Sequence, residues 1–547
     1  MKKGIYGRDD DDDDKEEEPG AGGARTWGGK DVCHTLNLGT DDEDRPTSPV
    51  APRAVGQGQH GSDSSDLDAV LLPDWEVLVL LRPDDDDAPS GNATCAFPGG
   101  PRMPASGRRA YTCAMPRPER RHSRPFRAPR IVVATLSSSA ADGEDAAPAA
   151  AAARSLTPEM MRWSGRLVYD SAVLDSAGDV LGVNRDAADV QCIYYRRSSA
   201  AIGNRDREVV ASLPAATSAQ QVFRCPPPPS TAATAASPTE ARQLRVTLAV
   251  AGEDPIPSVA TYNPEPAKTT ATTTTKKKLI CACTMVRDVA KFLREWVVYH
   301  SAVGVDRFYL YDNGSGDDLQ VRQLNAEGFH VSTHAWPCPK TQEAGFSYAA
   351  AAHLDSCEWM AFVNVDEFIF SLDWAGSGEP TKSMLWSIVT AIEPDVGQVT
   401  LGCKDFSPSG RTKHPKEGVT QGYMCRRRAE ERHKSLIRLD SGGPSLMNYV
   451  HHFELRPEFK VNHYKYQAWD EFKVKFRRRV STYVNHGSKD RTPGLGFKAV
   501  EPGGWPHKFC EVEDTLLRDV TRRWFGVGFT DKLAHHRPVG GTTHSSS

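Results

Sequence analysis

Residues 279–311 read LICACTMVRDVAKFLREWVVYHSAVGVDRFYLY, a pattern that predicts a strand, a helix and a second strand. The apolar run from Leu279 to Met285 is typical of a buried strand. Apolar side chains then recur at helical spacing from Val289 to Val303, and the following glycine predicts the end of that helix. Residues 308–311 are again apolar, which predicts a strand beside the first.

The alternation continues along the chain, with a helix expected at 319–327, a strand at 330–336, a helix at 342–357 and a strand at 359–365. Strands that alternate with helices over short loops predict an α/β fold with a doubly wound, mostly parallel sheet. Sheets of this kind bind ligands beyond the carboxyl ends of their strands. Two acidic loops, at Asp312 and Asp366, follow such ends.

The sequence before this unit has a different composition. Residues 1–64 contain an aspartate run and many glycines and prolines, so we expect a disordered acidic tail. Residues 65–260 hold short strand candidates near 70–81, 131–136, 166–169, 192–195 and 245–250, which predict a small β-rich module. A polar linker is expected at 261–278, the α/β domain at 279–530 and a disordered tail at 531–547.

Composition excludes several functional classes. The 547 residues carry a formal net charge of −4 with both signs mixed, so we expect no nucleic-acid partner. The sequence contains no run of about 18 apolar residues, so we expect no transmembrane helix in it. Its first residues also lack the apolar segment of a signal peptide. Among the cysteines, Cys95, Cys113, Cys192 and Cys225 flank loop-rich sequence, which predicts at least one disulfide in the N-terminal module.

The segment Trp359-Met-Ala-Phe-Val-Asn364-Val-Asp366-Glu367 carries the strongest chemical signal, because an apolar strand delivers two adjacent carboxylates to its end. A divalent cation prefers oxygen ligands, and a sugar-nucleotide diphosphate needs a cation to neutralise its leaving group. A solvent-facing turn is the competing interpretation. The second loop, Asp312-Asn-Gly-Ser315, adds a carboxylate and an amide that suit a ribose or base. Together the two loops predict a nucleotide-sugar site.

With these motifs, the chain resembles glycosyltransferase family 92 over about residues 68–525. The N-terminal module, with Leu72-Pro-Asp-Trp-Glu-Val77 and Val222-Phe-Arg-Cys225, is similar to the plant branch that includes β-1,4-galactan synthases. Further matching segments are Arg287, Phe292-Leu-Arg-Glu-Trp296, Phe308-Tyr-Leu-Tyr-Asp312, Arg432-His-Lys-Ser435, Val450-His-His-Phe453, Asn462-His-Tyr-Lys-Tyr466, Trp469-Asp-Glu-Phe-Lys473, Arg491-Thr-Pro-Gly-Leu-Gly496 and Phe509-Cys-Glu511.

The resemblance implies a GT-A-type fold and inverting, metal-assisted transfer of a sugar, commonly galactose from UDP-galactose, to a glycan acceptor, with Mn²⁺ as the expected metal. Asp366, Glu367 and His463 are the implied metal ligands, although a structural core histidine is an equal alternative for His463. The residues implied in donor binding are Asp312 and Asn313 at the nucleoside, Asn364 at the ribose, and Lys434 and Arg438 at the diphosphate.

Inverting transfer requires a general base, and both Glu431 and Asp470 remain candidates. Trp469 and Trp505 are candidates for stacking on sugar faces, with burial in the core as the alternative for each.

The chain departs from the family at two points. Asn364 stands where the family pattern has aspartate, so we expect reduced activity, and an Asn364→Asp gain in donor affinity or turnover of roughly ten- to a hundredfold. Family members are usually Golgi proteins with a membrane anchor, so either the sequence is incomplete at its N-terminus, which we expect, or this member is soluble. A homo-oligomer is compatible with the sequence.

Two other functions compete with the enzyme interpretation. A catalytically degenerate sugar- or nucleotide-binding protein of the same fold is the main alternative, since Asn364 can mark a degenerate site. A phosphohydrolase with a strand-end aspartate nucleophile is disfavoured, because an asparagine occupies the nucleophile position.

Overall fold

The structure is a computed structural model that describes residues 276–528 apart from 318, 338–341, 440–452 and 485–500. It also describes residues 67–71, 76–81, 93–98, 100–104, 106–108, 110–120, 126–133, 160–162, 168–169, 190–197, 207–219, 222–229, 244–250 and 252–262. The predicted tails 1–64 and 531–547, and residues 263–275 of the predicted linker, lie outside the described residues.

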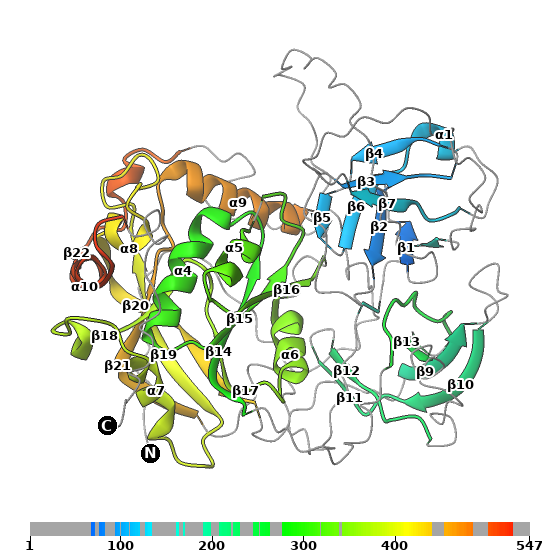
Figure 1. The fold of residues 1–547 in the computed structure, drawn as a ribbon, viewed down its shortest axis with the longest axis horizontal. Coiled ribbons are helices and arrows are strands. Elements are labelled where there is room, and N and C mark those ends of the chain that lie inside the picture. The colour runs from blue at the N-terminus through cyan, green and yellow to red at the C-terminus, as the bar shows by residue number, and fades with distance from the viewer. Residues whose placement is uncertain are drawn as a thin grey trace, which may run out of the picture.

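A large sheet forms the centre of the C-terminal domain (Figure 1). Its strands are β14 (Lys278–Val286), β15 (Arg307–Asp312), β16 (Val331–Ala335), β17 (Cys357–Phe362), β18 (Glu367–Ser371), β19 (Gln398–Phe406), β20 (Cys425–Arg438), β21 (Phe453–His463) and β22 (Val512–Glu513). Within the described ranges the sheet has nine strands in the order β16-β15-β14-β17-β20-β19-β21-β18, and β22 pairs with β20.

The direction of the strands differs between the two halves of the sheet. β14, β15, β16 and β17 pair in parallel, as the strand–helix alternation predicts. β17 pairs antiparallel with β20, and the pairs β19–β20, β18–β21 and β20–β22 are also antiparallel, while β19–β21 is parallel. The α/β class is therefore confirmed, but the sheet is mixed rather than mostly parallel. In the described residues no long helix connects β19 to β20, and these consecutive strands pair antiparallel.

Alternating side chains of the parallel strands supply two cores, one on each face of the sheet. On β14, Ile280 and Ala282 join one core, while Cys281 and Cys283 join the other. The first core is covered by α4 (Ala290–Val303), α5 (Val321–Ala326), α7 (Ser383–Thr390) and α10 (Leu516–Phe525), and the second by α6 (Gln342–Ala352). α6 ends before the predicted residue 357, because Cys357 begins β17 and forms a disulfide with Cys281. Within the described part of the chain, no helix has the length and apolar character needed to cross a membrane.

The N-terminal module consists of short strands in small sheets. They are β1 (Leu67–Leu71), β2 (Glu76–Leu81), β3 (Ala93–Ala96), β4 (Arg102–Pro104), β5 (Ser106–Arg108), β6 (Ala110–Ala114), β7 (Arg130–Val133), β8 (Met161–Arg162), β9 (Val190–Arg197), β10 (Arg207–Pro214), β11 (Thr217–Ala219), β12 (Val222–Arg224) and β13 (Leu244–Val250), with the short helix α1 (Arg117–Arg120). A buried ion pair from Arg245 of β13 to Asp68 of β1, 3.0 Å long, joins two of these sheets.

Both cysteine pairs of this module are bonded, Cys95 to Cys113 and Cys192 to Cys225. The predicted N-terminal disulfide is therefore confirmed.

The N-terminal module contacts the C-terminal domain at the end of β16. The Tyr169 hydroxyl donates a hydrogen bond of 2.6 Å to the backbone oxygen of Ala335. The Tyr169 ring also packs edge-on against Trp336, with 5.6 Å between ring centroids. This contact lies next to the loop that carries Asp312, because the Trp336 backbone N–H donates to the Asp312 carbonyl at 2.7 Å.

Candidate functional site

Two buried carboxylates and one imidazole meet where β17 leads into β18. Ligand atoms of Asp366, Glu367 and His463 all lie within 4.8 Å of one another. The His463 Nε2 is 3.7 Å from Asp366 Oδ2 and 3.7 Å from Glu367 Oε1. Glu367, the first residue of β18, pairs directly with His463, the last residue of β21, and residues opposite each other in a ladder share a face. Strand pairing therefore brings His463 to Asp366 and Glu367, two neighbouring residues that lie far before it in the sequence.

A third acid, Asp405, fixes the orientation of His463. It lies near the end of β19, opposite His463 in a parallel ladder. Its Oδ1 is 3.0 Å from His463 Nδ1, and its Oδ2 accepts from Lys465 Nζ at 2.8 Å. Burial raises the pKa of Asp405, but His463 and Lys465 outweigh it and lower the pKa to about 2. An ionised carboxylate only accepts hydrogen bonds, so His463 Nδ1 donates to Asp405, and Nε2 is the ring nitrogen that faces the other two acids.

Two lysines neutralise the clustered acids. Lys434 of β20 places Nζ 3.0 Å from Glu367 Oε1, and Lys475 places Nζ 2.5 Å from Asp366 Oδ2. Burial opposes ionisation of Asp366, yet Lys475, His463 and Lys434 together hold its pKa below the ordinary value. Burial likewise lowers the pKa of Lys434, and the contact with Glu367 more than reverses this. The site therefore keeps its charges by pairing them.

Asn364 supports Glu367 from within the turn. Its backbone N–H donates to Glu367 Oε2 at 2.7 Å, and its side-chain Nδ2 donates to Oε1 at 3.2 Å. Gln342 in turn donates to Asn364 Oδ1 at 3.4 Å. An aspartate at position 364 would place a second carboxylate against Glu367. The geometry therefore argues against the gain that the sequence led us to expect from Asn364→Asp.

The loop after β15 lies along the same edge of the sheet. Asp312 Oδ1 accepts from the Ser315 N–H at 2.8 Å, and Asn313 Nδ2 donates to the Trp336 carbonyl at 2.7 Å. These two hydrogen bonds fix the conformation of the loop. β14 separates β15 from β17, so the Asp312 loop and the Asp366 turn are two strand spacings apart, roughly 10 Å.

Helix α9 (Trp469–Val484) brings Lys475 to the site from outside the sheet. Its first turn is anchored on Trp505, whose ring lies 5.1 Å from that of Trp469 and 4.5 Å from that of Phe472. Both tryptophans are buried, so core packing, and not the proposed stacking on sugar, is their role in this structure. Asp470 is exposed and lies about 140° around the helix from Lys475, facing away from the carboxylates.

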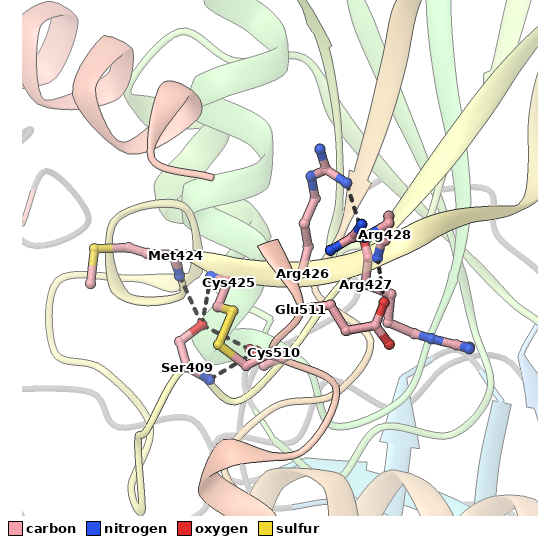
Figure 2. Close-up of a disulfide and its surroundings, with 9 residues drawn as sticks. Ser409, Met424, Cys425, Arg426, Arg427, Arg428, Cys510 and Glu511 are labelled. Carbon is pink, nitrogen blue, oxygen red and sulfur yellow. Dashed lines mark hydrogen bonds between the residues drawn. A yellow bond between two sulfur atoms is a disulfide. The ribbon is translucent and has the colours of Figure 1, made fainter. Parts of the chain in front are cut away.

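A disulfide between Cys425 and Cys510 ties the start of β20 to the segment that carries Trp505 (Figure 2). The Ser409 hydroxyl accepts from the backbone N–H groups of Met424 and Cys425, each at 2.9 Å. The indole N–H of Trp505 donates to the Gln467 carbonyl just before α9, at 2.9 Å. The strand that carries Lys434 and the helix that carries Lys475 are therefore held by one segment.

Arg438 does not reach the site, and its expected role at a diphosphate is corrected. It pairs with Trp359 at the start of β17, the end of the strand away from Asp366. Its guanidinium carbon lies 4.9 Å from the Trp359 ring centroid, and NH1 donates to the Pro394 carbonyl at 2.5 Å. The register of β20 explains this, because Arg438 is four residues beyond Lys434 along the strand.

Glu431, one of the two candidates for the general base, lies on β20, but its side chain is outside the described residues.

Sequence reasoning missed Asp405, Lys465 and Lys475. An acid at the end of the apolar strand 398–406 was a signal for Asp405, whereas no local pattern marks Lys475 on its helix.

Comparison with known proteins identifies the family. Residues 276–493 match the model of glycosyltransferase family 92. A glycosyltransferase family 92 protein of Oryza sativa subsp. japonica is 34% identical over 517 residues, which cover 85% of this chain and 81% of that protein. Family 92 proteins of Arabidopsis thaliana and Ricinus communis are 39% and 41% identical, and the matches cover 63% and 61% of their respective lengths and of this chain.

Solved structures align over part of the chain. Glucosyl-3-phosphoglycerate synthase of Mycobacterium tuberculosis, in complex with Mn²⁺, UDP and glucosyl-3-phosphoglycerate, gives a TM-score of 0.22 at 14% identity, over 39% of this chain and 81% of that chain. A mannosyltransferase of Pyrobaculum calidifontis, in complex with GDP-Man and Mn²⁺, gives a TM-score of 0.23 at 11% identity, over 46% of this chain and 71% of that chain. Likeness at this level establishes neither a fold class nor a ligand.

The family assignment follows from the sequence matches. They include an identity above 30% over most of both chains, and they cover the strands that form the cluster of Asp366, Glu367 and His463. The chain belongs to glycosyltransferase family 92.

Proposed function

We propose that this glycosyltransferase has a GT-A-type domain and transfers galactose from a UDP-sugar to a glycan acceptor, with inversion and with the help of Mn²⁺. The observation that carries the proposal is the grouping of Asp366, Glu367 and His463 at the strand edge. The fixed loop of Asp312 lies along the same edge and is available for the nucleoside end of the donor.

The donor set fits a divalent cation. Asp366 and Glu367 offer carboxylate oxygens and His463 offers an imidazole nitrogen, a combination that suits Mn²⁺. The Asp405 carboxylate accepts a hydrogen bond from His463 Nδ1, and metal-binding histidines generally donate such a bond from the ring nitrogen that does not bind the metal. When bound, the cation would stabilise negative charge on the diphosphate leaving group.

The remaining residues bind and orient. Lys434 is held in the site by Glu367 and is the candidate to meet the charge that develops on the departing UDP. Asn364 holds both oxygens of Glu367, so its contribution to donor binding is through the position of that carboxylate. These groups are preorganised by strand pairing, which lowers the cost of organising them during the reaction.

Inversion requires that one group accept the proton of the acceptor hydroxyl. Glu431 and Asp470 are the two candidates, and the exposed position of Asp470 on the far side of α9 favours Glu431. In this assignment Glu431→Gln abolishes transfer while UDP binding is retained, and Asp470→Asn leaves both unchanged. The reverse pattern would assign the base to Asp470.

Four disulfides among the described residues support folding in an oxidising compartment, in agreement with the proposed Golgi location. Fluorescence localisation of the tagged protein in plant cells tests this location, and retention in the cytosol would contradict it.

A binding protein without activity is the second candidate, and a specific contact favours it: the side-chain N–H of Asn364, which the sequence assigned to the ribose, donates to Glu367. Release of UDP from a panel of UDP-sugars, with a glycan acceptor and with or without Mn²⁺, separates the two functions. Mn²⁺-dependent release from UDP-galactose supports the enzyme. UDP binding without release from any donor supports the binding protein.

A further inference from the structure

The charges around the clustered acids are balanced. The three carboxylates Asp366, Glu367 and Asp405 are paired with Lys475, Lys434 and Lys465, respectively. The ionised forms of these six groups sum to zero. Because the carboxylates are buried, an added charge without a partner is costly.

This balance opposes binding of a divalent cation alone. Such an ion would give the site a charge of +2, whereas a nucleoside diphosphate would bring compensating negative charge with it. A diphosphate also offers oxygens to an ammonium group that gives up its carboxylate. We therefore expect the cation and the nucleotide to bind with positive coupling.

Lys475 differs from the other two lysines in its freedom to move. Its side chain is 47% exposed, whereas those of Lys434 and Lys465 are 24% and 25% exposed. It projects from the surface helix α9, and its backbone lies outside the sheet. A long side chain on a helix can turn to a new partner without disturbing strand pairing.

Resting on the proposed function, we propose that Lys475 is a positioning residue that pairs with Asp366 in the absence of donor and turns to the diphosphate when nucleotide and cation bind. The exchange frees an oxygen of Asp366 for the cation. Lys475 thus couples the two binding events, and by reciprocity each ligand strengthens the binding of the other by the same factor.

Electron paramagnetic resonance of free Mn²⁺ measures this coupling in the full chain, by titration with and without saturating UDP. In the wild type we expect UDP to strengthen Mn²⁺ binding within the roughly 5- to 150-fold range typical of coupled ligands. Lys475→Met should bind Mn²⁺ alone about tenfold more tightly, because Asp366 loses its competing partner, and should show a coupling factor at least roughly fivefold smaller. Lys475→Arg keeps the charge and should retain the coupling.

Lys473→Met is the matched control, since it removes the same charge from the same helix but lies about 160° around it from Lys475. It should behave as the wild type. If Lys475→Met leaves both the Mn²⁺ affinity and the coupling unchanged, while wild type binds both ligands, the role of Lys475 is wrong and the proposed function stands. If wild type binds no Mn²⁺ with or without UDP, both are wrong.

Discussion

Replacing Asp405 with asparagine tests whether His463 is held ready as a ligand. The substitution keeps the size of the side chain and one oxygen acceptor, but removes the charge shared by His463 and Lys465. The pKa of Asp405 lies at about 2, against an ordinary value of 3.8, because these two partners outweigh the effect of burial. This difference corresponds to roughly 2 kcal/mol of stability in the metal-free protein.

We therefore expect Asp405→Asn to lower the free energy of unfolding by about 2 kcal/mol at neutral pH. We also expect a loss of Mn²⁺ affinity of roughly 10- to 100-fold, the usual cost of losing a hydrogen bond behind a metal ligand. The pKa of Asp405 is lower in the folded than in the unfolded state, so its contribution is present above the unfolded pKa and is lost as pH falls toward 2. The stability difference between wild type and variant should narrow over that range.

Urea unfolding in the presence of a chelator measures the stability, and titration with Mn²⁺ and UDP at neutral pH measures the affinity. Asp306→Asn is the matched control, since Asp306 is also paired, 3.0 Å from Lys382, but lies just before β15 at the other end of the strand from Asp312. Asp306→Asn should lower the free energy of unfolding by less than about 1 kcal/mol and leave Mn²⁺ binding unchanged. If Asp405→Asn matches the wild type in both assays, the carboxylate does not orient His463 and this reasoning is wrong.

Three further substitutions probe the surroundings of the site. Asn364→Asp should destabilise the metal-free protein by about 1–2 kcal/mol through repulsion with Glu367; an unchanged melting curve in chelator would contradict this. Tyr169→Phe removes the bond to Ala335 and should raise the KM for donor more than it lowers kcat; equal effects on both would exclude a link to the donor loop. Burial lowers the pKa of His300 to about 4, so the folded protein favours the neutral imidazole. The free energy of unfolding should therefore decline as pH falls from about 6.5 to 4, and His300→Gln should remove part of this pH dependence in urea unfolding.

The parallel half of the sheet could be predicted from local pattern. The alternation of buried side chains from Leu279 onward, and the helical spacing up to Val303, reflect two separate cores that each strand must face. Strand–helix alternation then leaves few ways to connect the elements. Beyond residue 366 the strands pair mainly antiparallel, and their order depends on long-range contacts that no local pattern contains.

Prediction of the candidate site from sequence was limited in the same way, by contacts between residues far apart in the chain. Asp366 and Glu367 stand out because two acids follow an apolar strand, whereas His463 entered through the family resemblance. In the structure, the register of the strands decides which other residues reach these acids. Pairing of β21 with β18 brings His463 to Glu367, and the register of β20 places Arg438 at the end of β17 away from Asp366. Lys475 depends on how α9 docks on the aromatic side chains around Trp505, which is a property of tertiary packing.

The central claim is that Asp366 and its neighbours hold a divalent cation together with a uridine nucleotide. Calorimetric titration of wild type and Asp366→Ala with UDP, each with Mn²⁺ and with chelator, tests it most directly. We expect wild type to bind UDP in a strongly Mn²⁺-dependent manner and Asp366→Ala to lose that dependence, because it lacks a ligand carboxylate. Equal UDP affinity in the two proteins, or binding by wild type that needs no metal, would contradict the claim.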